Sequence, residues 1–317
     1  MHTQQNNNTE STDPTVEDTD SATCFEEHLE KIRNRNSSDR AFMGFTHSIS
    51  AIALSFTLIA FFSTTVAMVL GSDSPWVFLM ATLVAAGFAL VPDLDNSAST
   101  VKSAFGFVGS ALSVVFRSTA LVVQTVVRKK ADDAEPDPHR GFWHTIPSAL
   151  LIGLMVYGIT RIGGTVDLPW LGEFTTGTAL GFLVAFGAIH LMFAGVFKKS
   201  VKKVKKLGGP LGSLLAFVMS ALTTIVLMAN IPSELDMWWL GVACAFGCIA
   251  HILGDMFTKA GVPIFWPIIG LWKRKMWWKT RFLVTIEAGS DVESKFIAPM
   301  FVVISVGMLI YILTSGW

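Results

Sequence analysis

Seven apolar runs, each close to the length of a membrane-spanning helix, dominate this chain of 317 residues. They cover roughly residues 48–70, 75–91, 145–164, 175–197, 208–231, 237–257 and 296–313. A helix of about 20 apolar residues crosses the hydrocarbon core of a bilayer. Because lipid cannot hydrogen-bond to the backbone, such runs fold as helices. The sequence therefore predicts an all-α, polytopic integral membrane helical bundle of about six or seven spans.

The composition excludes the competing classes of protein. Hydrophobic residues make up 51% of the chain and charged residues 15%, whereas soluble domains carry roughly 25% charged residues. The three cysteines are Cys24, Cys244 and Cys248, which frame neither a disulfide-rich module nor a zinc knuckle. A soluble globular domain, a wholly disordered chain and a small secreted module are thus excluded.

Residues 1–40 differ from the rest of the chain. They are rich in Asn, Thr, Ser, Asp and Glu, with nine acidic and four basic side chains. Such a segment buries too little apolar surface to offset the entropy of ordering it. We therefore predict a disordered acidic tail over residues 1–40 and a helical membrane domain over residues 41–317.

A further apolar stretch, residues 97–127, contains Lys102 and Arg117. It is long for one helix and too charged for the centre of a membrane. We expect a re-entrant or interfacial helical segment that begins and ends on the same side of the bilayer.

Lysine and arginine predict the orientation of the bundle. Basic residues gather in the tail and in the segments 128–130, 198–206 and 273–281, whereas the short loops 71–74, 165–174 and 232–236 are acidic. The N-terminus is therefore expected in the cytoplasm. The lysines of 198–206 either fix this topology or bind anionic lipid head groups. No aromatic or motif context accompanies them, so nucleic acid is not an expected partner.

Ionisable side chains recur at one predicted face of the membrane. Each lies at the cytoplasmic end of a predicted span or in the loop beside it: His47, Asp93, Asp95, His139, Arg140, His144, His251 and Asp255. These residues come from four remote parts of the sequence. Ionisable groups next to membrane segments are costly, so their gathering on one face indicates a functional site. His190, deep within the span 175–197, is expected to be a hydrogen-bonded core residue.

The residue types of this set favour a metal site. His251 and Asp255 are four residues apart on a helix, so both side chains project from one side. Asp93 and Asp95 flank a single residue in a segment stiffened by Pro92. Imidazole with carboxylate favours zinc, manganese or iron over calcium. The set exceeds what one tetrahedral zinc ion requires, so two or more ions are expected. Considered alone, each of these histidines and aspartate pairs is also explained by a helix cap or a local hydrogen bond.

Four sequence blocks resemble those of the YdjM-like family, described as LexA-regulated, inner-membrane, metal-dependent hydrolases. The blocks are Thr46-His47, Pro92 to Asp95, His139 to Thr145, and His251 to Pro263. The resemblance extends over roughly residues 45–270. The chain departs from the family pattern at Trp143, where Thr is usual, and at Asn96, where His is frequent. The second departure puts the number of metal ions in question.

The resemblance implies a reaction and roles for residues. The family is distantly similar to zinc-dependent phospholipase C and P1-type nucleases, which implies hydrolysis of a phosphoester or phospholipid-type substrate. The expected metal ligands are His47, Asp93, Asp95, His139, His144, His251 and Asp255. Asp93 or Asp95 would instead accept a proton from the attacking water. Arg140 would pair with a substrate phosphate, and Thr258 and Gly261 would shape the following turn.

A non-catalytic alternative uses the same residues. They would serve a metal-stabilised membrane scaffold, a sensor or a cation-handling protein. Transporters place such groups near the membrane midplane, often in broken helices. The gathering of this set at one interface disfavours a transport pathway.

Overall fold

The computed structural model describes residues 17–96, 99–132, 140–168, 172–203, 210–231, 235–283 and 285–314. The long helices are α1 (Glu17–Leu70), α2 (Pro75–Phe88), α4 (Gly106–Val127), α5 (Ile146–Thr160), α6 (Thr176–Lys203), α7 (Pro210–Ala229), α8 (Trp239–Met256) and α10 (Ala298–Thr314). Shorter elements are η1 (Pro92–Asp95), α3 (Thr100–Ala104), η2 (Phe142–His144), β1 (Thr165–Leu168), β2 (Gly172–Thr175), α9 (Ile268–Trp272) and η3 (Glu293–Ile297).

The chain divides into two units, Met1–Ser38 and Asp39–Trp317. Helix α1 begins at Glu17, within the segment 1–40 that the sequence predicts to be disordered. Glu, Leu and Lys between Glu26 and Lys31 favour helix, so a helix can form there without burial. The membrane bundle and the candidate site lie wholly in the second unit.

Seven helical segments are long and apolar enough to cross a membrane, counted over the described residues. They are Gly44–Leu70, Pro75–Asp95, Gly106–Val127, Thr176–Gly195, Gly212–Ala229, Trp239–Met256 and Glu293–Thr314. This result confirms the all-α, polytopic fold. Among the described residues, strands occur in the antiparallel hairpin β1–β2, in which Thr165 pairs with Thr175.

The predicted span 145–164 is shorter in the structure. Helix α5 ends at Thr160 after 15 residues, because the chain turns at Arg161 and enters the hairpin at Thr165. Thr145 caps its start: the Thr145 hydroxyl accepts from the Ser148 amide, and Ser148 reciprocates. This capping box fixes the position of His144, directly before the cap.

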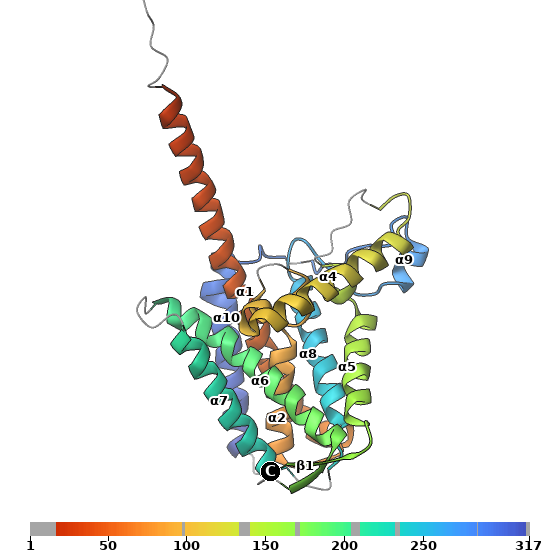
Figure 1. The fold of residues 1–317 in the computed structure, drawn as a ribbon. Coiled ribbons are helices and arrows are strands. Elements are labelled where there is room, and N and C mark those ends of the chain that lie inside the picture. Colours follow the sequence, from red (N-terminus) through yellow and green to blue (C-terminus); the bar gives the residue numbers. More distant parts are fainter. Residues whose placement is uncertain are drawn as a thin grey trace, which may run out of the picture. The chain divides into compact units, whose positions relative to one another are not determined.

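Small residues let the inner helices α2, α5, α6 and α8 approach closely (Figure 1). A Cβ atom on Gly87 of α2 would lie 2.0 Å from the Ala188 carbonyl oxygen of α6. One on Gly247 of α8 would lie 2.2 Å from the Ala85 carbonyl oxygen of α2. Such crossings are typical of membrane bundles, where packing rather than hydrophobic exclusion holds helices together. They align the ends of α2 and α8.

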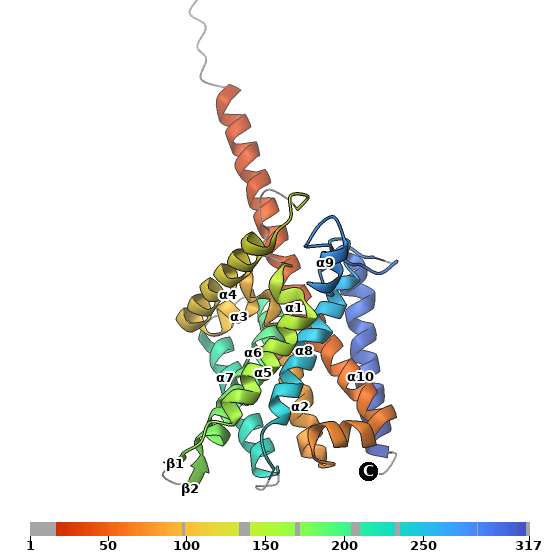
Figure 2. The same cartoon turned by 90° about the vertical axis from the view of Figure 1, so that its right-hand side faces the viewer.

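Helix α4 lies across one end of the bundle instead of alongside the other helices (Figures 1 and 2). Its inner face carries Gly109, Ser113, Ala120 and Gln124, whereas large apolar side chains such as Phe107, which is 87% exposed, face outward. An outward apolar face belongs in lipid. Both views show α4 crossing one end of the bundle, although its length and apolarity would also allow it to span a membrane, so a re-entrant or interfacial position for residues 97–127 stays a prediction.

Candidate metal centre

Pro92 sets up one wall of the site. Because proline has no backbone N–H and its ring clashes with the carbonyl four residues earlier, α2 stops at Phe88. The chain then forms the single turn η1, which carries Asp93. Near the same break, the Ala89 carbonyl accepts a hydrogen bond from Nδ1 of His251, at 2.7 Å. A carbonyl can only accept, so Nδ1 of His251 carries the proton and Nε2 points into the site.

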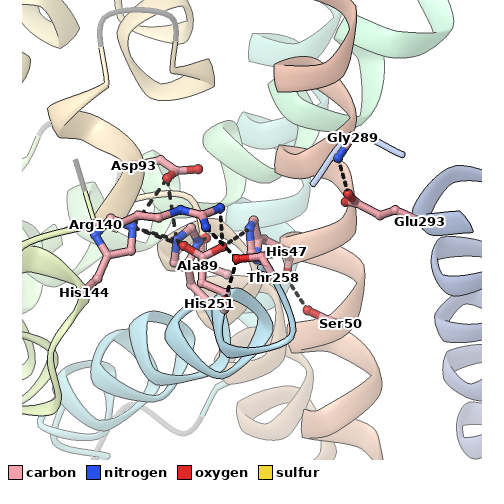
Figure 3. A network of polar contacts seen from close by, with 11 residues as sticks. His47, Ser50, Ala89, Asp93, Arg140, His144, His251, Thr258, Gly289 and Glu293 are labelled. Atoms are coloured by element: carbon pink, nitrogen blue, oxygen red, sulfur yellow. Dashed lines mark hydrogen bonds and ion pairs between the residues drawn. The ribbon is translucent and has the colours of Figure 1, made fainter. Parts of the chain in front are cut away.

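Two imidazoles and two carboxylates converge on one point (Figure 3). Nε2 of His144 lies 3.2 Å from Nε2 of His251. Oδ1 of Asp93 lies 3.6 Å from each of these nitrogens. Oδ2 of Asp255 lies 3.5 Å from Nε2 of His144 and 3.6 Å from Nε2 of His251. These four atoms form the centre of the candidate site.

The centre has the dimensions of a metal-ligand shell. Bonds of 2.0–2.1 Å in tetrahedral geometry place ligand atoms about 3.3 Å apart. The distance between the two nitrogens and the distances from each nitrogen to the two carboxylate oxygens range from 3.2 to 3.6 Å. His144 and His251 are fully buried and Asp255 is 1% exposed. A buried carboxylate requires a compensating positive charge, and Arg140 supplies one to Asp255.

The other oxygen of Asp255 is held from a different side. Oδ1 accepts a hydrogen bond from Nη2 of Arg140 at 3.3 Å and lies 3.4 Å from Nε2 of His47. Nη1 of Arg140 donates to the Thr258 hydroxyl at 2.5 Å, and that hydroxyl donates to the Asp255 carbonyl. Arg140 therefore orients Asp255, so the phosphate contact expected of Arg140 would need its remaining N–H groups.

Arg140 adopts an unusual backbone conformation. Its φ is +56°, the left-handed region that ordinary residues rarely enter. The side chain is nevertheless buried. Strained residues of this kind cost of order 1–3 kcal/mol and cluster at functional sites. The bonds to Asp255 and Thr258 hold Arg140 in this conformation.

His47 packs against the backbone of α8. Its ring centroid lies 3.9 Å from that of His251, and a Cβ atom on Gly254 would lie 3.0 Å from Nδ1 of His47. That nitrogen is buried and has no hydrogen-bond partner. Gly254 thus leaves the space that His47 occupies.

Two groups of side chains could hold a metal ion, among the described residues. One comprises His47, His251 and Asp255, and the other Asp93, His144 and His251. Both groups share His251, whose Nδ1 is already bonded to Ala89. A single Nε2 serves one ion, so a second ion would rely on His47 and Oδ1 of Asp255. The residues present fit one buried ion best.

Burial also sets the protonation of His144. The pKa of His144 is lowered below its ordinary value of 6.5, chiefly because burial disfavours the charged ring, against the opposing pull of Asp93 and Asp95. A neutral imidazole is the form that binds metal. This suits Nε2 of His144 as a ligand.

Most of the predicted site residues that the structure describes lie together. The structure brings together His47, Asp93, Arg140, His144, His251 and Asp255. Asp95 is buried, and its charge acts on His144, but it belongs to neither ligand group. His139 lies outside the described residues. His190 contacts Ser220 and the Phe105 ring, away from the site.

The residues that support the ligands were not predicted from the sequence. Trp143, one of the departures from the family pattern, stacks on Phe116 of α4 with centroids 4.1 Å apart and donates to the Phe116 carbonyl. It therefore fastens the turn that carries His144 to α4. The Ala89 carbonyl had no signal in the sequence beyond its place before Pro92.

Residues 192–316 match the family model described as YdjM inner membrane protein. This match confirms the resemblance over that part of the chain, which contains the block from His251 to Pro263. It also includes α10, beyond the range 45–270, and it begins after the blocks of His47, Asp93 and His139. No curated protein and no solved structure matches the chain. The family description and the apolar helices together indicate an integral membrane protein.

Proposed function

We propose that this protein is a membrane-bound, metal-dependent hydrolase that acts on a phosphoester, with a phospholipid-type substrate favoured. The observation that carries the proposal is the meeting of Nε2 of His144 and Nε2 of His251, 3.2 Å apart, between the carboxylates of Asp93 and Asp255. Zinc is the expected ion, with manganese or iron as alternatives.

The ion would act as a Lewis acid that lowers the pKa of a water molecule towards about 7. His144, His251 and Asp255 are buried and would hold it. Asp93 is 18% exposed, so its carboxylate can reach both the centre and an entering molecule. Asp93 is therefore the residue proposed to accept a proton from the attacking water. Arg140 fixes the orientation of Asp255.

The surroundings of the site favour a lipid substrate. Helix α4 contacts η1 and η2, which carry Asp93 and His144, and its outward face is apolar. A substrate that reached Asp93 by passing along α4 would enter from the lipid leaflet next to that helix. We expect water-soluble short-chain esters to be hydrolysed poorly compared with the same head group in a bilayer. Equal rates on both substrates would contradict a lipid substrate.

The location that we propose follows from the basic loops. The site and the N-terminus would face the cytoplasm across a bacterial inner membrane. Lysines at 198–206 would then meet the anionic cytoplasmic leaflet.

Asp93→Asn tests the catalytic proposal. The variant keeps the shape of the side chain but cannot accept a proton, so hydrolysis should fall by at least about 100-fold. Its melting temperature in detergent should stay close to that of the wild type. Asp167→Asn on exposed β1 is the matched control and should retain full activity. An active Asp93→Asn protein would rule out this role for Asp93.

The second candidate function is a metal-stabilised scaffold, sensor or cation-handling protein. The deep burial of His144, His251 and Asp255 favours it, since structural metal sites are closed. In that case a chelator would lower the melting temperature, and no phosphoester or phospholipid would be turned over by the metal-loaded protein.

A further inference from the structure

Helix α9 turns an apolar face outward. Ile268, Leu271 and Trp272 lie three and four residues apart, so they share one side of the helix. Their exposed fractions are 66%, 64% and 86%. The other side is closely packed, since a Cβ atom on Gly270 would lie 2.2 Å from the Met276 carbonyl oxygen. This contact fixes which side of α9 faces outward.

The segment that carries α9 is held at the end of the bundle where α4 crosses (Figures 1 and 2). The Ile264 carbonyl accepts a hydrogen bond, at 3.0 Å, from the amide of Ile146, the first residue of α5. The Phe282 amide donates, at 2.9 Å, to the carbonyl of Met256, the last residue of the candidate span α8. Both ends of the segment 265–281 are therefore tied to helix ends, close to the level at which α8 would leave the membrane.

Helix α9 is also joined to the end of α4. Lys129 follows α4, and its Nζ donates to the carbonyls of Gly270, Leu271 and Lys273 at 2.7, 3.2 and 2.9 Å. A cation on the last carbonyls of a helix is favourable. Asp132 accepts from two backbone amides of the loop that follows α9. Because the outward face of α4 is apolar too, the two helices present apolar side chains at the same end of the bundle.

Basic side chains border the apolar face of α9. Lys273 and Arg274 follow Trp272 directly, and both are exposed. Residues 260–286 contain no acidic residue. The same segment also carries Lys275, Lys279 and Arg281. Apolar and aromatic side chains beside lysine and arginine are typical of segments that lie in the head-group layer of an anionic membrane.

Charge and position together select the occupant of this face. An exposed apolar face of this kind marks a contact with lipid or with another protein. The ties to α5 and α8 place it next to a membrane boundary, where acyl chains are at hand. The basic border adds a preference for negative charge, which the phosphates of anionic lipids supply.

We propose that α9 and the adjoining Lys273 and Arg274 form a surface that binds anionic phospholipids. Ile268, Leu271 and Trp272 lie among the upper parts of the acyl chains, and the two basic side chains meet the head groups. The surface contains none of the candidate metal ligands and does not depend on the proposed hydrolysis.

Tryptophan fluorescence of the full chain in lipid nanodiscs tests where Trp272 lies. Subtraction of the Trp272→Phe spectrum from the wild-type spectrum isolates the emission of Trp272. Phospholipids brominated close to the head group should quench this emission. At equal mole fraction in phosphatidylcholine, brominated phosphatidylglycerol should quench it more than brominated phosphatidylcholine does. Emission that neither lipid quenches, or that both quench equally, would overturn the proposal.

Two double variants separate a local surface from the general charge of this end of the protein. Lys273→Gln with Arg274→Gln should lower the preference for phosphatidylglycerol by about three- to tenfold, while Trp272 stays quenched. The matched control, Lys259→Gln with Lys295→Gln, removes the same charge from two lysines that already pair with Glu287 and Asp291. It should keep the preference. An equal loss in both double variants would rule out a local binding surface.

Salt gives a readout on the wild-type protein alone. Raising the salt concentration should remove most of the preference for phosphatidylglycerol, because exposed charges are screened. The quenching of Trp272 itself should persist, since apolar burial holds it in the lipid. Loss of quenching with salt would contradict the insertion of α9. None of these measurements uses metal or hydrolysis, so this proposal and the proposed function can fail separately.

Discussion

At the scale of single residues, the site depends on a backbone carbonyl and a glycine that neither bind metal nor transfer a proton. The Ala89 carbonyl fixes which nitrogen of His251 faces inward. Gly254 makes room for His47. The types and spacing of His251 and Asp255 could be read from the sequence, because a helix brings residues four apart to one face. The supporting backbone could not, since it acts only through tertiary contact.

Gly254→Ala should displace His47. The added methyl group would lie 3.0 Å from Nδ1 of His47, so the ring must move and the affinity for metal should fall by about 10-fold. Gly158→Ala on α5 meets nothing within 4 Å and should bind metal as the wild type does. Competition with a chelator of known affinity measures both. Equal affinities in the two variants would show that His47 takes no part in binding.

The lowered pKa of His144 predicts a dependence of stability on pH in the metal-free protein. In the unfolded chain this imidazole binds a proton near pH 6.5, whereas the buried ring does so only at lower pH. The contribution of His144 to the free energy of unfolding is therefore complete above pH 6.5. It is lost as the pH falls towards the lower folded pKa, at up to about 1.4 kcal/mol per pH unit.

Melting temperatures of chelator-treated wild type and His144→Asn between pH 7.5 and 5 test this dependence. The wild type should lose stability more steeply below pH 6.5 than the variant. Parallel curves would show that His144 is not the group responsible.

At the scale of helices, the length and apolarity of the runs predicted most of the elements. Their ends were harder to place, because caps and turns decide them locally: the hairpin after Arg161 shortens α5, and Pro92 ends α2 early. The position of α4 across the bundle follows from its small inner residues and its large outer ones. The sequence showed the charged residues of this segment, but it did not show which face of α4 would be buried.

Gly247→Ala should weaken the crossing of α8 over α2. Its methyl group would lie 2.2 Å from the Ala85 carbonyl oxygen, so the helices must separate, at a cost of about 1–3 kcal/mol or more. Gly307→Ala on α10, which meets nothing within 4 Å, should keep or slightly raise the stability. Thermal unfolding in detergent compares the two. An equally stable Gly247→Ala protein would contradict the close packing of α2 against α8.

At the scale of the whole molecule, the distribution of basic residues predicts that the N-terminus lies in the cytoplasm. Among the three cysteines, Cys24 lies in the N-terminal tail, whereas Cys244 and Cys248 are buried. A membrane-impermeant maleimide should therefore label the wild-type chain in inside-out vesicles but not in intact cells. Labelling in intact cells would place the N-terminus, and with it the site, on the outer side.

The sequence also predicted that remote ionisable residues would meet at one end of the bundle. Of the seven candidates that the structure describes, six lie in contact there: His47, Asp93, Arg140, His144, His251 and Asp255. Which of these residues would bind the metal, and which would only orient the ligands, depends on interatomic distances. The spacing of residues along the sequence does not give those distances. Asp95, two residues from Asp93, illustrates this, because the turn η1 directs only one of the pair into a ligand group.

A bound metal ion would distinguish a metal centre from a cluster of His and Asp side chains that only bond to one another. Elemental analysis of protein purified in detergent without chelators, and resupplied with metal, would compare the wild type with the double variant His251→Ala, Asp255→Ala. We expect at least one zinc, manganese or iron ion per wild-type chain and none in the variant. A wild-type chain without bound metal would contradict the metal centre and, with it, the proposed hydrolase.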